Sequence, residues 1–204
     1  MDVLNGKRLI LGSKSPRRDE LLTMAGIPHE IFVTDADEST VVYHQGEPER
    51  YVEELSKLKA ACSVSALGES MGDGVILTAD TVVYAPETKE VLGKPADRED
   101  AYRMIRLLSG GKHRVITGCT VICGNACITG HVSTDVWFRD LSDEEIFAYI
   151  DSSEPYDKAG AYGIQEGASV FVHRIDGDYF NIVGLPVEWV YVTLKKLCGE
   201  GNPA

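Results

Sequence analysis

The chain has 204 residues, of which 44% are hydrophobic, and a formal net charge of −12 at pH 7. Its length suits one domain that buries a substantial core, so we expect a single domain over residues 1–204. The acidic charge disfavours a broad nucleic-acid or membrane surface, so a phosphate site has to be a local basic pocket. The sequence has no secretory signal pattern and no stretch of membrane-spanning length, and we therefore expect a cytoplasmic protein.

The first structured segment is predicted to be a strand, a polar turn and a helix. The apolar run Leu9–Leu11 breaks at Gly12, and Ser15 followed by Pro16 is typical of a helix N-cap with proline at the first position. Free N–H groups and the helix dipole favour an anion at such a helix start. The polar side chains there are Ser13, Lys14, Ser15, Arg17 and Arg18. We interpret the segment as a phosphate cradle; the alternative is a capped helix with two solvated arginines.

The next segments supply acidic and basic groups. Residues 27–33 are predicted to form a strand, and an acidic turn follows at residues 34–38. Carboxylates near a phosphate site can hold Mg²⁺, although a solvated loop is the commoner outcome. A long helix is predicted over Pro48–Leu67, with Lys59 on the same apolar stripe as Leu55. Lys59 therefore either snorkels to the edge or reaches a buried anion.

A strand predicted over residues 75–84 contains an aspartate. Its sequence, VILTADTVVY, is apolar and rich in β-branched residues. An ionised aspartate inside such a strand is costly unless it is paired or bound to a metal, so Asp80 is a candidate functional residue. The alternative is a carboxylate hydrogen-bonded to neighbouring backbone. A hairpin then leads to a return strand that ends at Gly93-Lys94-Pro95, which places Lys94 near the same end of the sheet.

The following elements are predicted to be scaffold. Asp97 caps a helix, Gly124-Asn125 turns a hairpin, and Ser142 with Glu145 forms a capping box for a short helix through Ile150. The strands of that hairpin are predicted over residues 115–123 and 128–138. The five cysteines contain no C-x-x-C pair, so we expect buried free thiols rather than a zinc site.

A second polar loop spans residues 154–165. Its small residues let backbone approach a ligand, and the Gln165 amide can both donate and accept, as reading a base edge requires. Strands over residues 169–175 and 179–183 and a helix over residues 186–197 complete the prediction.

Seven short motifs occur in one order along nearly the whole chain. They are S-K-S-P-R-R-D-E-L-L at 13–22, A-D-T at 79–81, G-K-P at 93–95, L-S-G at 108–110, D-K-A-G-A-Y-G-I-Q at 157–165, D-G-D-Y at 176–179 and G-L-P at 184–186. With these motifs the chain resembles the Maf family of nucleoside triphosphate pyrophosphatases. Several motifs in register are far more specific than any one of them.

The resemblance implies both a fold and a reaction. The implied fold is mixed α/β and related to the inosine triphosphatases (Maf/Ham1), with an elongated sheet flanked by helices and a cleft between two lobes. The resemblance also implies a protein that is commonly a homodimer. The implied reaction is hydrolysis of the α–β phosphoanhydride of a nucleoside triphosphate to monophosphate and pyrophosphate, assisted by Mg²⁺ or Mn²⁺. The motif at 157–165 resembles the branch that acts on dTTP and UTP.

The resemblance also implies roles for individual residues. Asp80 matches the proposed proton acceptor. Matches to positions associated with substrate choice are Arg17, Thr81 and Gln165, and matches to other site-lining positions are Ser13, Arg18, Glu38, Lys59 and Lys94. Joining this to the residue chemistry, we expect Lys59 and Lys94 to neutralise the triphosphate and Glu38 and Asp80 to hold the metal. The rival interpretations are a phosphatase that releases orthophosphate and a catalytically silent nucleotide-binding regulator of cell division.

Two residues depart from the family pattern. Gly12 stands where the family usually has alanine, which we predict to be harmless. Thr78 stands where glycine commonly precedes A-D-T, which adds a methyl and a hydroxyl close to Asp80.

Overall fold

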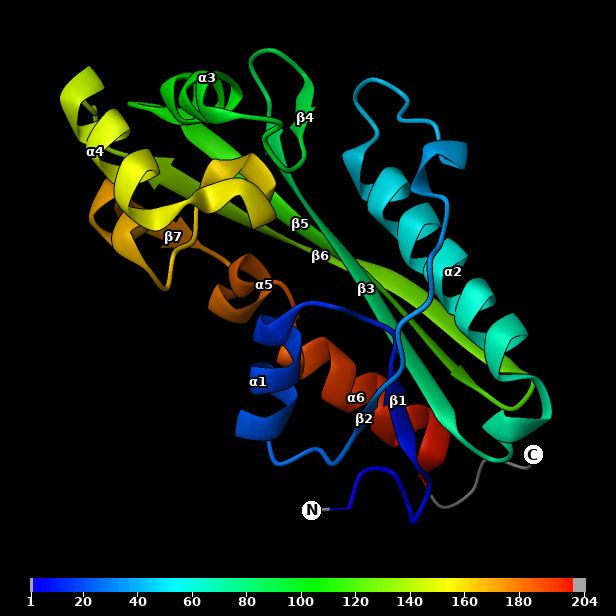
Figure 1. Ribbon diagram of the computed structural model, residues 1–204. Coiled ribbons are helices and arrows are strands. Elements are labelled where there is room, and N and C mark those ends of the chain that lie inside the picture. Colours follow the sequence, from blue (N-terminus) through cyan, green and yellow to red (C-terminus); the bar gives the residue numbers. More distant parts are fainter. Residues whose placement is uncertain (1, 200–204) are drawn as a thin grey trace.

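The computed structural model describes residues 2–199, which form one seven-stranded sheet (Figure 1). The strands are β1 (Leu9–Leu11), β2 (Glu30–Ile31), β3 (Val75–Ala85), β4 (Glu90–Leu92), β5 (Lys112–Cys123), β6 (Ala126–Phe138) and β7 (Val172–Asp176). Their order is β2-β1-β3-β5-β6-β7, and β4 pairs with β3. β1 is parallel to β2 and β3, while the other pairs are antiparallel. The predicted mixed α/β class is therefore confirmed.

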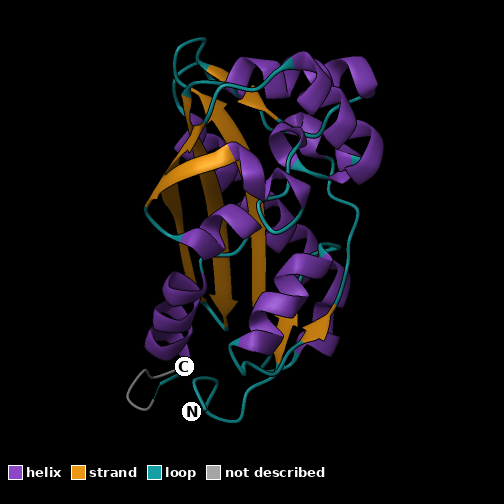
Figure 2. Cartoon of the chain, turned by 90° about the vertical axis from the view of Figure 1, so that its left-hand side faces the viewer, coloured by secondary structure: helices purple, strands orange, loops and turns teal. Residues whose placement is uncertain are grey.

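Helices flank this sheet on both faces. They are α1 (Pro16–Met24), α2 (Pro48–Leu67), α3 (Arg98–Leu108), α4 (Asp143–Ser153), α5 (Tyr179–Val183) and α6 (Val187–Cys198). Figure 1 shows α3 and α4 near one end of the long strands and α1 and α6 near the other, and Figure 2 shows the long strands running through the molecule between these groups. In the part of the chain that is described, no helix is long and apolar enough to cross a membrane.

Alternation along β3 divides its side chains between two cores. Ile76 and Val82 pack on the side covered by α2, whereas Leu77, Ala79 and Val83 belong to the larger core on the opposite face. Because successive side chains of a strand point to opposite faces, Asp80 has the parity of the α2 side and its neighbour Thr81 that of the larger core. The A-D-T motif therefore places side chains on both faces of the sheet, at its centre.

A gap in strand pairing exposes the middle of β3. On one edge, β1 pairs with β3 only at residues 75–77 and β4 pairs only at residues 83–85. Residues 78–82 lie between these two short partners, so their backbone groups on that edge are left to side chains or ligands. Asp80 and Thr81 lie in this gap, which is where a cleft forms.

Several predicted elements are confirmed. α2 has the predicted bounds, β3 extends the predicted strand by one residue, and the hairpin turns at Gly124-Asn125 between β5 and β6. The Asp97 side chain caps α3 and the Ser142–Glu145 capping box opens α4, which continues to Ser153 rather than Ile150. The five cysteines are free thiols, but the expectation of burial holds for Cys119 and Cys198 and fails for Cys127, which is exposed.

Three predicted strands differ from the structure. The strand expected over residues 27–33 is reduced to Glu30–Ile31, and the one expected from 169 begins only at Val172, after a 3-10 helix at Gly167–Phe171. The strand predicted over residues 179–183 is wrong, because this segment is the short helix α5. The Asp178 carboxylate accepts the Phe180 N–H at 2.8 Å as an N-cap, and Gly184 ends the helix at φ 126°. A short apolar run cannot decide between helix and strand without such caps.

The two departures from the family pattern lie against each other. A Cβ atom at Gly12 would lie 2.8 Å from Cγ2 of Thr78 and 2.9 Å from Oγ of Ser63. Glycine therefore leaves room for Thr78, whose methyl group an alanine at residue 12 would overlap, and this agrees with the prediction that glycine is harmless here. Thr78 also donates to the Ser56 carbonyl at 2.7 Å, so its hydroxyl ties β3 to α2 instead of entering the cleft.

Candidate active site

The cleft has a volume of about 810 Å³ and lies over the unpaired stretch of β3. Its walls come from the start of α1, the turn at 34–38, α2, the loop at 93–94 and the loop at 157–166. The structure brings all nine site residues predicted from the sequence into this one cleft: Ser13, Arg17, Arg18, Glu38, Lys59, Asp80, Thr81, Lys94 and Gln165. Their shared location agrees with a common site, while their individual roles remain predictions.

Arg18 forms the floor of the cleft at the α1 end. Its guanidinium donates to Ser13 Oγ at 3.0 Å, Thr81 Oγ1 at 3.1 Å, and the carbonyl oxygens of Ala79 and Gly184, each at 2.8 Å. The bond to Ala79 satisfies a β3 carbonyl in the gap between β1 and β4. Burial lowers the pKa of Arg18, whereas the nearby charge of Asp80 raises it. Arg18 thus holds α1, β3 and the end of α5 together while remaining a cation beside the cleft.

The start of α1 differs in detail from the predicted cradle. Ser15 occupies the N-cap position but makes no side-chain capping bond. Instead, Ser13 Oγ accepts the Ser15 N–H at 3.2 Å as well as the Arg18 bond. The cradle is therefore organised by Ser13 and Arg18 rather than by a capping Ser15. Lys14 lies at the rim, where its ammonium group is 2.9 Å from Asp35 Oδ1.

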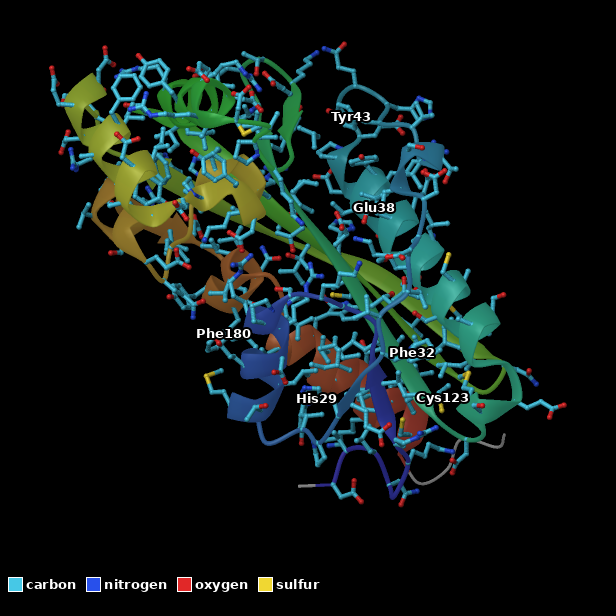
Figure 3. The ribbon with its side chains drawn as sticks, viewed as in Figure 1. His29, Phe32, Glu38, Tyr43, Cys123 and Phe180 are labelled. Atoms are coloured by element: carbon cyan, nitrogen blue, oxygen red, sulfur yellow. The ribbon has the colours of Figure 1, made fainter. Side chains whose placement is uncertain are left out.

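A second charged group, built on Lys59, lies on the α2 side of the cleft. The Lys59 ammonium donates to Asp80 Oδ1 and lies 3.1 Å from Glu38 Oε1. The side chains of Lys59 and Asp80 are 18% and 14% exposed, so both are largely buried yet reach the cleft. Glu38, in the 3-10 turn Glu38–Thr40, is more exposed, and Figure 3 shows it next to α2. The inward position predicted for Lys59 is confirmed, and its partner is the carboxylate that the sequence singled out.

The opposite wall carries the remaining predicted residues. Lys94 and Gln165 are exposed and line the cleft. Arg17 crosses toward this wall, where its guanidinium donates to Asp157 Oδ2 at 2.9 Å. Basic groups therefore reach the cleft from α1, α2 and the loop after β4, which suits a ligand with several negative charges.

Sequence reasoning missed several residues of the cleft, among them Lys158 and Tyr51. Lys158 has a side chain only 9% exposed and lies between Asp157 and Glu166. Tyr51 lines the cleft from α2; burial, Asp80 and Glu38 together raise its pKa. The sequence could have indicated Tyr51, since it lies on the helical stripe that continues at intervals of four residues to Lys59. Nothing comparable indicated Lys158, because its partners depend on how the loop folds.

The residues present fit a divalent cation that is shared with a substrate. Within residues 2–199, no three His, Cys, Asp or Glu side chains gather closely enough to hold a metal by themselves. Glu38 and Asp80, however, both reach the Lys59 ammonium and so place two carboxylates at one point of the cleft. Mg²⁺ is commonly bound by one or two carboxylates together with substrate phosphates. The donor set therefore suits a metal that arrives with a phosphate ligand.

Sequence comparison identifies the family. The family model described as Maf-like protein matches residues 8–197. The chain belongs to the Maf family. This Maf-like chain is 44% identical over 192 residues to the dTTP/UTP pyrophosphatase of Bacillus cereus (strain ATCC 10987 / NRS 248), covering 94% of this chain and 91% of the relative. It is 43% identical over 190 residues to the protein of the same name from Bacillus anthracis (strain CDC 684 / NRRL 3495), covering 93% and 95%.

Two solved structures show a weaker likeness to the Maf-like chain. A HAM1 protein from Coxiella burnetii is 12% identical, with 93% of this chain and 99% of that chain covered at a TM-score of 0.46. A nucleoside-triphosphatase / dITP/XTP pyrophosphatase from Mycobacterium abscessus ATCC 19977 / DSM 44196 is 11% identical, with 64% and 72% covered at a TM-score of 0.34. At these TM-scores, neither likeness adds an argument about fold or function.

Proposed function

We propose that this Maf-like protein is a nucleoside triphosphate pyrophosphatase that converts dTTP and UTP to the monophosphate and pyrophosphate. The observation that carries the proposal is the placement of the Asp80 carboxylate in a cleft whose walls carry basic residues. A pure phosphate binder gains nothing from this negative charge, whereas hydrolysis needs a base for water. The printed names of the two Bacillus relatives support the same reaction.

The chain's own residues divide the work between binding and proton transfer. Arg18 and the N-terminus of α1 attract the triphosphate, with Arg17 and Lys94 reaching it from the walls. Lys59 fixes the orientation of Asp80 by donating to Oδ1. Asp80 then accepts a proton from the water that attacks the α-phosphorus, and the same cations stabilise the charge that develops on the phosphate oxygens.

We further propose that Glu38 and Asp80 hold a divalent cation, Mg²⁺ or Mn²⁺, together with the substrate. When bound, this cation neutralises phosphate charge and polarises the phosphoryl oxygens. Lys59 contacts one oxygen of each carboxylate, Glu38 Oε1 and Asp80 Oδ1, so a cation held by this pair would share the two carboxylates with the lysine.

Base selection is assigned to Gln165 and the loop that carries it. Gln165 lines the cleft, and an amide carries both a donor and an acceptor, which suits the edge of a uracil or thymine ring. Thr81 contributes indirectly, since its hydroxyl is already bonded to Arg18 and lies 2.9 Å from the Thr117 hydroxyl. Replacing Gln165 with alanine should reduce the preference for UTP over CTP and GTP, measured as the ratio of kcat/KM values.

The deciding experiment compares wild type with Asp80→Asn. Pyrophosphate and orthophosphate release are measured from UTP, dTTP, CTP and GTP with Mg²⁺, with Mn²⁺ and with chelator. We expect metal-dependent pyrophosphate release that is fastest for UTP or dTTP and falls about a hundredfold to a thousandfold in the variant. Asp151→Asn serves as the control, because Asp151 pairs with Arg98 outside the cleft.

Each rival function predicts a different outcome of that experiment. A phosphatase would release orthophosphate, and a catalytically silent regulator of cell division would bind nucleotide without metal-dependent turnover. Full activity in a normally folded Asp80→Asn protein would overturn the assigned base. We also propose that the protein is cytoplasmic and works as a homodimer. Subcellular fractionation would test the location, and light scattering on the purified protein would test the oligomeric state.

A further inference from the structure

Four charged side chains form a chain of ion pairs from α1 to the loop on the opposite wall of the cleft. Arg17 Nη1 is 2.9 Å from Asp157 Oδ2, and the other oxygen of that carboxylate is 2.8 Å from Lys158 Nζ. Lys158 Nζ is also 3.1 Å from Glu166 Oε2. The charges alternate along the chain, so it is balanced. Its first two members are 140 residues apart in sequence, and the chain therefore joins two separately built walls.

Burial makes the middle of this chain rigid. An ammonium group as buried as that of Lys158 is costly unless carboxylates compensate it, and here two of them do. Its stem packs under the loop: a Cβ atom at residue 163 would lie 2.8 Å from Lys158 Cε, so a side chain there would displace the Lys158 stem. Burial alone raises the pKa of Asp157, but hydrogen bonds from Lys158 and Arg17 outweigh it and hold the pKa at about 2. The carboxylate is therefore ionised at any physiological pH.

The far end of the chain fixes the turn that carries Gln165. The Glu166 N–H donates to the Gly163 carbonyl at 3.1 Å and closes this turn, and the Gly163 N–H donates to Tyr149 Oη at 3.1 Å. Ile164 is buried within the turn, whereas Gln165 is exposed and lines the cleft. The position of the Gln165 amide thus depends on Lys158–Glu166 on one side and on Tyr149 on the other.

We propose that Asp157 is a positioning residue that sets the span of the cleft between its phosphate end and its base end. It holds Arg17 at one end and, through Lys158, the Gln165 turn at the other. This inference rests on the proposed function, because the ligand that fills both ends is a pyrimidine nucleoside triphosphate. If the span relaxes, such a ligand cannot satisfy both ends at once, and binding of the preferred base loses its advantage.

The test breaks the chain at two points without touching Arg17 or Gln165. Asp157→Asn removes the central charge, Glu166→Gln weakens the far end, and Asp151→Asn removes a carboxylate from an exposed arginine pair elsewhere as a matched control. We measure kcat and KM for UTP and GTP with Mg²⁺, binding of both nucleotides by calorimetry with chelator, and thermal unfolding. In Asp157→Asn we expect KM for UTP to rise about tenfold and the UTP-to-GTP preference to fall about tenfold, as loss of one charge-assisted bond implies.

The remaining readouts separate positioning from general structural damage. We expect kcat for UTP to change by less than about threefold, Glu166→Gln to show a smaller shift in the same direction, and the control to match wild type. Unchanged preference in both cleft variants, or an equal loss of kcat for every nucleotide with KM unchanged, would overturn the inference. If Asp157→Asn does not fold, Glu166→Gln decides. Selective UTP binding by a wild type that releases no pyrophosphate would refute the proposed function alone, whereas binding of neither nucleotide would refute both.

Discussion

Arg18 and Lys59 reach the same cleft from different helices and meet different partners. The buried guanidinium donates to two hydroxyls and two carbonyls, and among the described residues no carboxylate is bonded to it. The Lys59 ammonium instead contacts the carboxylates of Asp80 and Glu38. Neutral acceptors satisfy the Arg18 donors, and Asp80 acts on its charge only from nearby without a bond, whereas the Lys59 group carries a net negative charge.

This difference gives the cleft two electrostatic ends. The end at Arg18 favours an anion, and the end at Lys59, with its excess carboxylate, favours a cation. A metal–nucleotide complex has both features, and a simple phosphate ligand has only one. The bonds of Arg18 tie three segments of the fold together, whereas those of Lys59 hold the two carboxylates that face the cleft.

Removal of Lys59 should give the largest effect and should fall on activity. In Lys59→Met the carboxylates lose their common partner and the triphosphate loses a cation, so we expect kcat/KM to fall about a hundredfold to a thousandfold. Because the cleft lets water reach both carboxylates, the midpoint of thermal unfolding should move by only about 2–4 °C. Retention of wild-type activity by a folded Lys59→Met protein would contradict the catalytic side of the comparison.

Replacement of Arg18 should have its main effect on stability, whereas replacement of Lys59 should have its main effect on activity. Arg18→Met leaves buried acceptors without donors, and we expect the free energy of unfolding to fall by about 3 kcal/mol or more, measured by urea titration. Arg18→Lys keeps the charge but lacks the planar fork, so most of the loss should remain. If the lysine variant were as stable as wild type, charge rather than bond geometry would be the main role of this residue.

Substitutions at Gly12 and Thr78 test how closely the wall that carries Lys59 is packed. Gly12→Ala forces a methyl against Thr78 Cγ2, and we expect a cost of about 1–3 kcal/mol in stability. Thr78→Ser keeps the hydroxyl bond to Ser56 and removes that methyl, so the double variant should recover part of the loss, while the close contact with Ser63 Oγ remains. A double-mutant cycle on urea unfolding measures the coupling, and strictly additive effects would show that the overlap is relieved elsewhere.

A third buried basic group, His113, extends the comparison and gives the smallest effect near pH 7. His113 is fully buried with Tyr162 Oη 2.8 Å from Nε2, and burial lowers its pKa from 6.5 to about 3. Below pH 6.5 the unfolded chain takes up a proton that the folded protein does not, so stability falls with decreasing pH until about pH 3.

The expected slope is at most about 1.4 kcal/mol per pH unit across that window. His113→Gln should remove this contribution and flatten the dependence of unfolding free energy on pH between 6 and 4, relative to wild type. An unchanged slope would mean that other groups dominate acid destabilisation. In contrast to Arg18, His113 remains neutral in the folded protein, because it has too few hydrogen-bond acceptors around it to hold a charge in the core.

Much of the scaffold and the membership of the site could be predicted from the sequence. The periodicity of Pro48–Leu67 and the β-branched run around Asp80 define α2 and β3, and the cost of burying one carboxylate and one lysine indicated that they needed partners. These are local properties, because a side chain's solvation cost and a helix's stripe depend on its own neighbours in sequence.

What only the tertiary structure decided are the contacts between segments far apart in the chain. The space available at Gly12 depends on which residue the adjacent strand places opposite it, since a Cβ atom there would meet Thr78. Asp157 is an ordinary loop acid in sequence, and it becomes the link between two walls only when residue 17 is brought beside it. Such pairings follow from strand order and packing, so the sequence determined which chemical groups were available and the fold decided which of them meet.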